Sequence, residues 1–366
     1  MALRRLRRVS GHLLEPSRAA APDGSEELVL TLGSGQVSTS SGKLGQLRAS
    51  AASLSSRELR ARFDADGYLY LPSLIPSDRV EAAYAEARGE LEASGTWPGG
   101  RFSAAWRSHG DVMRVAEAPE LAAAFSALMG GVEVASYPFK WLRTGQPGDG
   151  TGFHVDNVYM NRGSTNLTTA WIPLMDVPYE LGGLCVLEGS HALPGFDRFR
   201  RTYGEHDWSS WVRAHLSLPP CVGRSPCLTD ASALLCAPGG AAQDNEVIGH
   251  SGIYSPDPQH MLTAFDPDCR FLTAEFKAGD VLLLQMFTVH GALANTSQDT
   301  TRLNIDCRWQ PKHEGFDARY LTGGDEPFPG TVLYTSRAPA TNLVPSPSPP
   351  KMPVLLMRMR YAATTE

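Results

Sequence analysis

The sequence predicts a mainly β domain of barrel type with helices on its N-terminal side, and two segments predict its strands. Residues 278–290 open with a Gly-Asp turn and continue as an apolar run, which is typical of a single strand ending at His290. Residues 301–309 alternate with a period of two, as a strand with two unlike faces does. The apolar face holds Leu303, Ile305, Cys307 and Trp309, and the polar face holds Arg302, Asn304, Asp306 and Arg308.

The polar face of residues 301–309 has two interpretations. It can lie in solvent, as one side of an antiparallel sheet often does. It can instead line a ligand cavity inside a barrel. We favour the cavity because His290, a candidate metal ligand, comes just before this strand.

Helices are expected ahead of the β region. Ser55 and Glu58 match a capping box in front of an apolar run. Residues 78–91 carry apolar side chains at helical spacing, and a third helix is expected at about 119–129. We expect these helices to pack against the outside of the barrel as scaffold.

Composition is typical of an enzyme domain with one large core. The chain has 366 residues, of which 42% are hydrophobic and 20% charged. A net charge of -6 argues against a nucleic-acid partner. No apolar stretch reaches the length of about 18 residues that a membrane span needs. The six cysteines form no CxxC pair, which argues against a zinc site, and we expect Cys185 and Cys307 on core strands in reduced form.

His154 and Asp156 are the first candidates for a metal site. They lie two residues apart, so on an extended segment both side chains project to the same side. A His-x-Asp tripeptide is common by chance and is a weak indication alone. His290 strengthens it, because it supplies a third candidate ligand. Two imidazoles and one carboxylate suit a non-haem Fe(II) centre and leave coordination positions open. Arg302 follows His290 by twelve residues, and its planar guanidinium can pair with the distal carboxylate of 2-oxoglutarate.

Three segments resemble blocks of the phytanoyl-CoA dioxygenase family. These are residues 63–72, 169–178 and 180–191, and the resemblance extends over about residues 55–315. It implies a double-stranded β-helix, also called a jelly roll or cupin-like fold, with flanking N-terminal α-helices. The resemblance makes His154, Asp156 and His290 the iron ligands, and Arg302 and Trp171 the contacts to 2-oxoglutarate.

The resemblance also implies an activity. The family uses Fe(II), 2-oxoglutarate and O2, with ascorbate as a candidate reductant, and releases succinate and CO2. Halogenases of the family have a small residue in place of the carboxylate ligand, and because Asp156 is present we expect hydroxylation of an aliphatic C–H bond. Ala292 departs from the family pattern, since many relatives have serine there; one hydrogen bond to the cosubstrate is absent or comes from elsewhere. The expected substrate is a fatty acyl-CoA or another small carboxylate.

Two alternatives remain open at this stage. One is a cupin-like protein that binds a metal or ligand without catalysis. The other is an iron cupin enzyme that does not use 2-oxoglutarate. Arg302 distinguishes the 2-oxoglutarate mechanism from the second alternative, because only the 2-oxoglutarate mechanism requires this arginine.

Other residues carry weaker predictions. His191 is expected to orient backbone rather than to bind iron. The irregular stretch of residues 193–268 is the expected place for substrate contacts, and its arginines 198, 200, 201 and 213 contact an anionic group or belong to a solvated helix. Lys140 and Arg143 lie on opposite faces of a strand, so at most one points inward.

The predicted domain organisation has three parts. Residues 1–54 read as a targeting segment and flexible linker, residues 55–335 as the oxygenase domain, and residues 336–366 as a Pro-rich tail. The first fourteen residues are rich in arginine and free of acids, as organellar transit peptides are. Arg5-Leu6 and His12-Leu13 resemble an N-terminal peroxisomal signal. We therefore expect the protein to be located in the peroxisome, with the peroxisomal import receptor as a partner. The mitochondrion and the cytoplasm are the alternative locations.

Overall fold

The computed structural model describes residues 27–98, 103–106, 110–138, 140–204, 253–266, 268–320 and 332–334. The arginine-rich leader, Arg213 and the tail of residues 336–366 lie outside the described residues. No helix among the described residues is long and apolar enough to cross a membrane.

The fold is built on two facing sheets. The large sheet runs in the order β14 (Val332–Tyr334), β5 (Ser103–Trp106), β7 (Lys140–Gly145), β13 (Arg302–Pro311), β8 (Thr168–Pro173), β11 (Val281–Gln285) and β4 (Tyr68–Leu71), and β6 (Val134–Ser136) also pairs with β13. The small sheet runs in the order β12 (His290–Ala292), β9 (Leu184–Leu187), β10 (Phe271–Thr273) and β3 (Leu44–Gln46). The two sheets form the predicted double-stranded β-helix, and β1 (Val29–Leu32) and β2 (Gly35–Ser38) form a separate hairpin.

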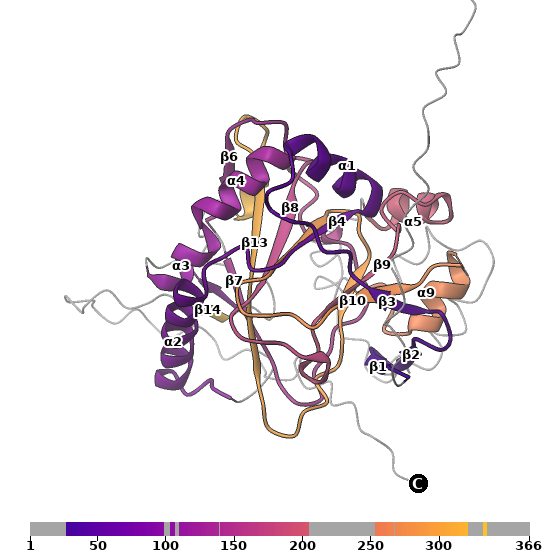
Figure 1. Ribbon diagram of the computed structural model, residues 1–366, viewed down its shortest axis with the longest axis horizontal. Coiled ribbons are helices and arrows are strands. Elements are labelled where there is room, and N and C mark those ends of the chain that lie inside the picture. The colour runs from indigo at the N-terminus through magenta and orange to yellow at the C-terminus, as the bar shows by residue number, and fades with distance from the viewer. Residues whose placement is uncertain are drawn as a thin grey trace, which may run out of the picture.

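The N-terminal helices cover one face of the large sheet. They are α1 (Ser56–Asp66), α2 (Ser77–Ala93), α3 (Asp111–Ala116) and α4 (Pro119–Leu128), and Figure 1 shows them on one side of the molecule with α5 (Asp197–Thr202) and α9 (Pro258–Ala264) on the other. The capping box is confirmed, because Ser55 accepts from the Glu58 backbone and Glu58 reaches back to Ser55. The core under these helices contains the whole predicted apolar face of β13, so that pattern is confirmed too.

The predicted strand of residues 278–290 is in fact two strands. β11 ends at Gln285 and belongs to the large sheet, whereas β12 begins at His290 and pairs with β9 in the small sheet. Between them the chain turns, with the Thr288 backbone donating to the Gln285 carbonyl and the Thr288 hydroxyl donating to Gly67 at 2.6 Å. Residues 285–290 contain none of the Gly, Pro, Asn or Asp residues that usually mark a turn, so the sequence pattern concealed it.

The predicted linker needs a second correction. Within residues 1–54, β3 pairs in parallel with β10, and Leu44 and Leu47 are buried. Leu44 and Leu47 therefore hold this Ser/Gly-rich segment against the small sheet. The described part of residues 1–54 belongs to the folded domain.

Candidate metal centre

His154 and His290 are brought together by their backbones. Each residue donates its N–H to the carbonyl of the other, at 3.1 and 3.0 Å, which forms an isolated antiparallel bridge. Their rings lie 4.3 Å apart between centroids. Residues separated by more than a hundred positions are thus held as neighbours by main-chain hydrogen bonds, which do not depend on a metal.

Asp156 completes the cluster. Its neighbour Val155 is extended, and Asp156 itself begins the short 3-10 helix η1 (Asp156–Val158). The Asp156 Oδ1 atom lies 3.8 Å from His290 Nε2. One ligand atom from each of His154, Asp156 and His290 falls within 4.8 Å of the other two. The side chains converge as the His-x-Asp spacing predicted, although a helical turn begins where a continued strand was expected.

Hydrogen bonds orient both imidazoles for metal binding. His154 Nδ1 lies 3.1 Å from the Gly152 carbonyl, and His290 Nδ1 lies 2.9 Å from the Thr288 carbonyl. A carbonyl accepts only from a protonated Nδ1, so each Nε2 is left with a lone pair for a metal. Two imidazole nitrogens and one carboxylate oxygen on one side fit Fe(II) with open positions. The residues present therefore fit the metal that the family uses.

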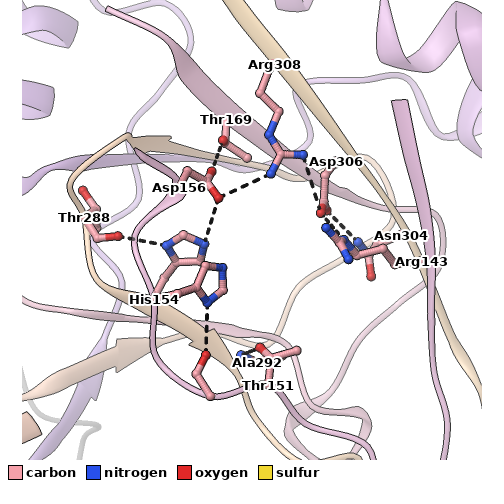
Figure 2. A network of polar contacts seen from close by, with 12 residues as sticks. Arg143, Thr151, His154, Asp156, Thr169, Thr288, Ala292, Asn304, Asp306 and Arg308 are labelled. Carbon is pink, nitrogen blue, oxygen red and sulfur yellow. Dashed lines mark hydrogen bonds and ion pairs between the residues drawn. The ribbon is translucent and has the colours of Figure 1, made fainter. Parts of the chain in front are cut away.

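Asp156 is held ionised by its neighbours. Burial alone would raise the pKa of this carboxyl, but the Arg308 guanidinium and the two imidazoles lower the pKa below its ordinary value. Arg308 Nη2 lies 3.4 Å from Asp156 Oδ1, and the Thr169 hydroxyl donates to Oδ2 (Figure 2). Each carboxylate oxygen therefore has its own donor, and the group is fixed in one orientation.

His154 is held neutral. Burial, followed by the neighbouring His290, lowers the pKa of His154 to about 3. A neutral imidazole is the form that binds a metal, so the site is prepared for a cation over most of the pH range.

This depressed pKa predicts how the stability of the metal-free protein depends on pH. Below the ordinary histidine pKa the unfolded chain takes up a proton that folded His154 does not, so stability falls as the pH drops from about 6.5 toward 3. Between about pH 7 and pH 5 the loss should be of the order of 1–2 kcal/mol. This loss is measured by denaturant unfolding of chelator-treated wild type and His154→Gln at both pH values. Equal losses in the two proteins would contradict the prediction.

Arg302 lies on the inner face of the large sheet. It begins β13, is 7% exposed, and faces Gly145 on β7 in the strand register. The whole polar face of β13 is buried, which excludes the interpretation of a solvated face. That this face lines a ligand cavity stays a prediction. Asn295 supports this corner by donating to the carbonyls of Gly145 and Thr300 at 2.9 and 2.7 Å.

Trp171 and Ala292 lie between the two sheets. Trp171 is buried on β8 and packs edge-on against Phe276 with ring centroids 4.8 Å apart. Its contact to 2-oxoglutarate stays a prediction. The backbone N–H of Ala292 donates to the Thr151 hydroxyl at 2.7 Å. A hydroxyl is therefore present beside this position, although the side chain itself has none.

The other sequence predictions separate into inner and outer residues. Arg143 lies on the inner side and pairs with Asp306, whereas Lys140 is fully buried on the opposite side and donates to Glu117 at 2.9 Å. His191 is outside the cluster and contacts the Asp64 carbonyl at 3.0 Å, which agrees with a backbone role. Arg200 pairs with Asp197 and donates to two backbone carbonyls, so its contacts lie within the chain. The choice between substrate contact and a solvated helix for the arginines of this stretch stays open.

Three residues of the site were not assigned a role from sequence. They are Thr169, Arg308 and Trp141, whose ring lies under the Arg308 guanidinium at 4.3 Å. The alternation of β13 placed Arg308 on the same face as Arg302, and Thr169 begins one of the family-like blocks. No local pattern could show that either one contacts Asp156.

A family model and several solved structures are similar to this chain. The family model described as phytanoyl-CoA dioxygenase (PhyH) matches residues 63–303. Among solved structures, the chain is similar to the carbocyclase SnoK from nogalamycin biosynthesis, described as non-heme and alpha ketoglutarate dependent (22% identity, TM-score 0.49, 74% of this chain and 90% of that chain). It is also similar to the epimerase SnoN from the same biosynthesis (20% identity, TM-score 0.46, 77% and 96%) and to apo HygX from Streptomyces hygroscopicus (16% identity, TM-score 0.40, 70% and 87%).

A comparison with curated proteins gives no significant sequence match. The family model nevertheless covers well over half of the chain, including the triad and Arg302. The chain belongs to the phytanoyl-CoA dioxygenase family.

Proposed function

We propose that this Fe(II)- and 2-oxoglutarate-dependent oxygenase hydroxylates an aliphatic C–H bond of a small organic substrate, with release of succinate and CO2. The candidate substrates are a fatty acyl-CoA and another small carboxylate. One observation supports the proposal most directly: the His154, Asp156 and His290 cluster is complete, and Arg302 is buried on the same face of β13 as Arg308, which contacts Asp156.

Each residue has a defined task in this proposal. Bound Fe(II) with 2-oxoglutarate and O2 supplies the oxidising chemistry. The triad would hold the metal from one side and leave the opposite side to ligands. Arg302 would pair through its fork with the distal carboxylate of the cosubstrate. The apolar side chains between the sheets, including Trp171 and Leu282, keep water from this interior.

The silent-binder alternative is less well supported. The triad is intact, both imidazoles are oriented by carbonyls, and Asp156 is supported by two donors. Burying this many polar and charged groups is costly, and a chain without catalysis has no reason to maintain all of them. The alternative of an iron cupin enzyme that does not use 2-oxoglutarate is tested by whether activity requires Arg302.

The test is anaerobic absorbance of the purified protein with Fe(II) and 2-oxoglutarate. Chelation by the cosubstrate gives a weak visible charge-transfer band, which should be present in wild type and lost in His154→Ala. No band in protein shown to contain iron would remove the 2-oxoglutarate mechanism. A band would justify screening acyl-CoAs and free carboxylic acids for coupled release of succinate.

Gly145 offers a way to disturb Arg302 without changing it. A Cβ built on Gly145 would lie 3.0 Å from Arg302 Nη2 and 3.1 Å from its Cζ, which is tight for a flexible side chain. Gly145→Ala should displace the guanidinium and weaken 2-oxoglutarate binding by about tenfold, or roughly 1.4 kcal/mol. Fe(II) stoichiometry should be unchanged. Titration of the charge-transfer band measures this effect, and unchanged cosubstrate affinity would show that Arg302 does not contact it.

A further inference from the structure

The turn between β11 and β12, residues 286–289, contacts two of the three segments that carry the candidate metal ligands. We call it the ligand turn. Its Thr288 carbonyl accepts from His290 Nδ1 at 2.9 Å. Its Met286 carbonyl accepts from the backbone N–H of the residue after Asp156 at 3.1 Å. The position of the ligand turn therefore affects how both ligand side chains face a metal.

Two buried hydroxyl groups fix the ligand turn to its surroundings. The Thr288 hydroxyl donates to the Gly67 carbonyl at 2.6 Å, and the Ser190 hydroxyl accepts from the Val289 backbone N–H at 2.9 Å. Thr288 and Ser190 are both fully buried, so bulk water does not reach these bonds. Thr288 therefore has two roles at once, because its side chain is fixed by Gly67 and its carbonyl orients His290.

The support for the ligand turn is the C-terminal end of α1. The last carbonyls of a helix lack partners within the helix, and here side chains from other segments contact them. Gln285 donates to the Phe63 carbonyl at 3.1 Å, and His191 contacts the Asp64 carbonyl at 3.0 Å. The residues on either side of the ligand turn are thus attached to a helix end rather than to a loop.

Gly67 permits the close approach of the helix end to the ligand turn. Its φ of 76° lies in the left-handed region, which favours glycine. A Cβ at this position would lie 2.8 Å from the Thr288 hydroxyl oxygen and 2.3 Å from His191 Nδ1. No side chain fits there, so the short distance that the Thr288 hydrogen bond needs depends on a glycine.

We propose that Thr288 is a positioning residue of the metal centre, and that its hydroxyl bond to the end of α1 holds the carbonyl that fixes the tautomer and orientation of His290. An imidazole that donates through Nδ1 presents the lone pair of Nε2 to a metal. Without the hydroxyl bond the ligand turn can shift, and the carbonyl shifts with it. The helix α1, expected from sequence to be scaffold alone, is then part of the support of the metal site. This inference concerns metal binding and does not depend on the substrate.

The experiment compares metal binding with folding stability in variants of the full chain. Thr288→Val keeps the shape of the side chain and removes the hydroxyl, whereas Thr288→Ser keeps the hydroxyl. Thr273→Val is the matched control, because Thr273 is also fully buried and donates to a carbonyl, that of Leu184, at 2.8 Å. The probe is Co(II). Competition with a chelator gives its affinity, the visible spectrum reports its coordination, and urea unfolding of metal-free protein gives the stability.

Both valine variants should lose stability to a similar degree, because each loses one buried hydrogen bond. Only Thr288→Val should also lose Co(II) affinity, by about ten- to a hundredfold, as happens when a group that orients a ligating imidazole is disturbed. Its Co(II) spectrum should change as well. Thr288→Ser should bind Co(II) within about threefold of wild type, because its hydroxyl can still reach Gly67.

Three results would overturn the proposal. They are wild-type Co(II) affinity in Thr288→Val, an equal loss of affinity in Thr273→Val, and a Thr288→Ser variant as weak as Thr288→Val. If Thr288→Val does not fold, Ser190→Ala takes its place, since it removes the other hydroxyl that holds the ligand turn. A loss of about tenfold in its Co(II) affinity would support the proposal, and unchanged affinity would overturn it.

Failure of the metal centre and failure of the proposed function give different results. Wild type that bound no Co(II) would overturn the metal centre itself, and this inference with it. Wild type that binds Co(II) but releases no succinate with any substrate would count against the proposed hydroxylation. The comparison of Thr288→Val with Thr273→Val would keep its meaning in that case, because it measures metal binding without turnover.

Discussion

Arg302→Ala is expected to weaken 2-oxoglutarate binding by about a hundred- to a thousandfold while Fe(II) still binds. Removing one partner of a buried, hydrogen-bonded charge pair costs about 3–4 kcal/mol, which corresponds to this factor. Arg302 lies at the start of β13 and is not one of the three candidate ligands, so the metal site should survive. Succinate release should fall with the cosubstrate affinity and recover in part at high 2-oxoglutarate concentration.

The measurement is a titration of the anaerobic charge-transfer band together with steady-state succinate release. Arg57→Ala is a matched control, because Arg57 is an exposed arginine on α1 and its loss should leave both the band titration and succinate release unchanged. The affinity of Arg302→Lys for 2-oxoglutarate should lie between those of wild type and Arg302→Ala, since lysine keeps the charge but not the planar fork. Full activity in Arg302→Ala would favour an iron cupin enzyme that does not use 2-oxoglutarate.

Asp156→Ala should abolish iron binding and activity and also destabilise the metal-free protein. The variant removes one of the three candidate ligands and leaves the buried Arg308 without its hydrogen-bonded counter-charge. Breaking a buried ion pair from one side costs about 3 kcal/mol, because the remaining charge stays out of water. Loss of the carboxylate should lower turnover by at least about a thousandfold, equivalent to roughly 4 kcal/mol of transition-state free energy.

A double variant tests the origin of the instability. Asp156→Ala with Arg308→Leu removes both charges, and it should recover most of the unfolding free energy without recovering iron. Urea unfolding of chelator-treated proteins and iron stoichiometry give the two readouts. Glu92→Ala breaks an exposed pair with Arg88 and serves as a control that should change stability little. A double variant no more stable than Asp156→Ala would show that Arg308 is not the cause.

The sequence determined the chemistry of the site because the spacing of nearby residues is enough to identify the candidate metal ligands. His154 and Asp156 are two residues apart, and their side chains converge as that spacing predicts. Strict alternation over residues 301–309 separated an apolar face from a polar one. The structure places Leu303 in the core under the helices and buries Arg302 on the opposite face. The capping box at Ser55 fixed the start of α1 in the same way. Each of these patterns depends only on the geometry of one helix or strand.

Tertiary structure decided what lies across from each residue. The break between β11 and β12, the anchoring of β3 to β10, and the contacts of Arg308 with Asp156 and Trp141 join segments far apart in the chain. No local period carries such information, because pairing between strands depends on how two sheets close around a common core. The sequence by itself therefore determined which metal and cosubstrate chemistry the chain supports. Only the fold decided that Arg308 borders Asp156, because that contact exists only once β13, β8 and the Asp156 turn are packed together.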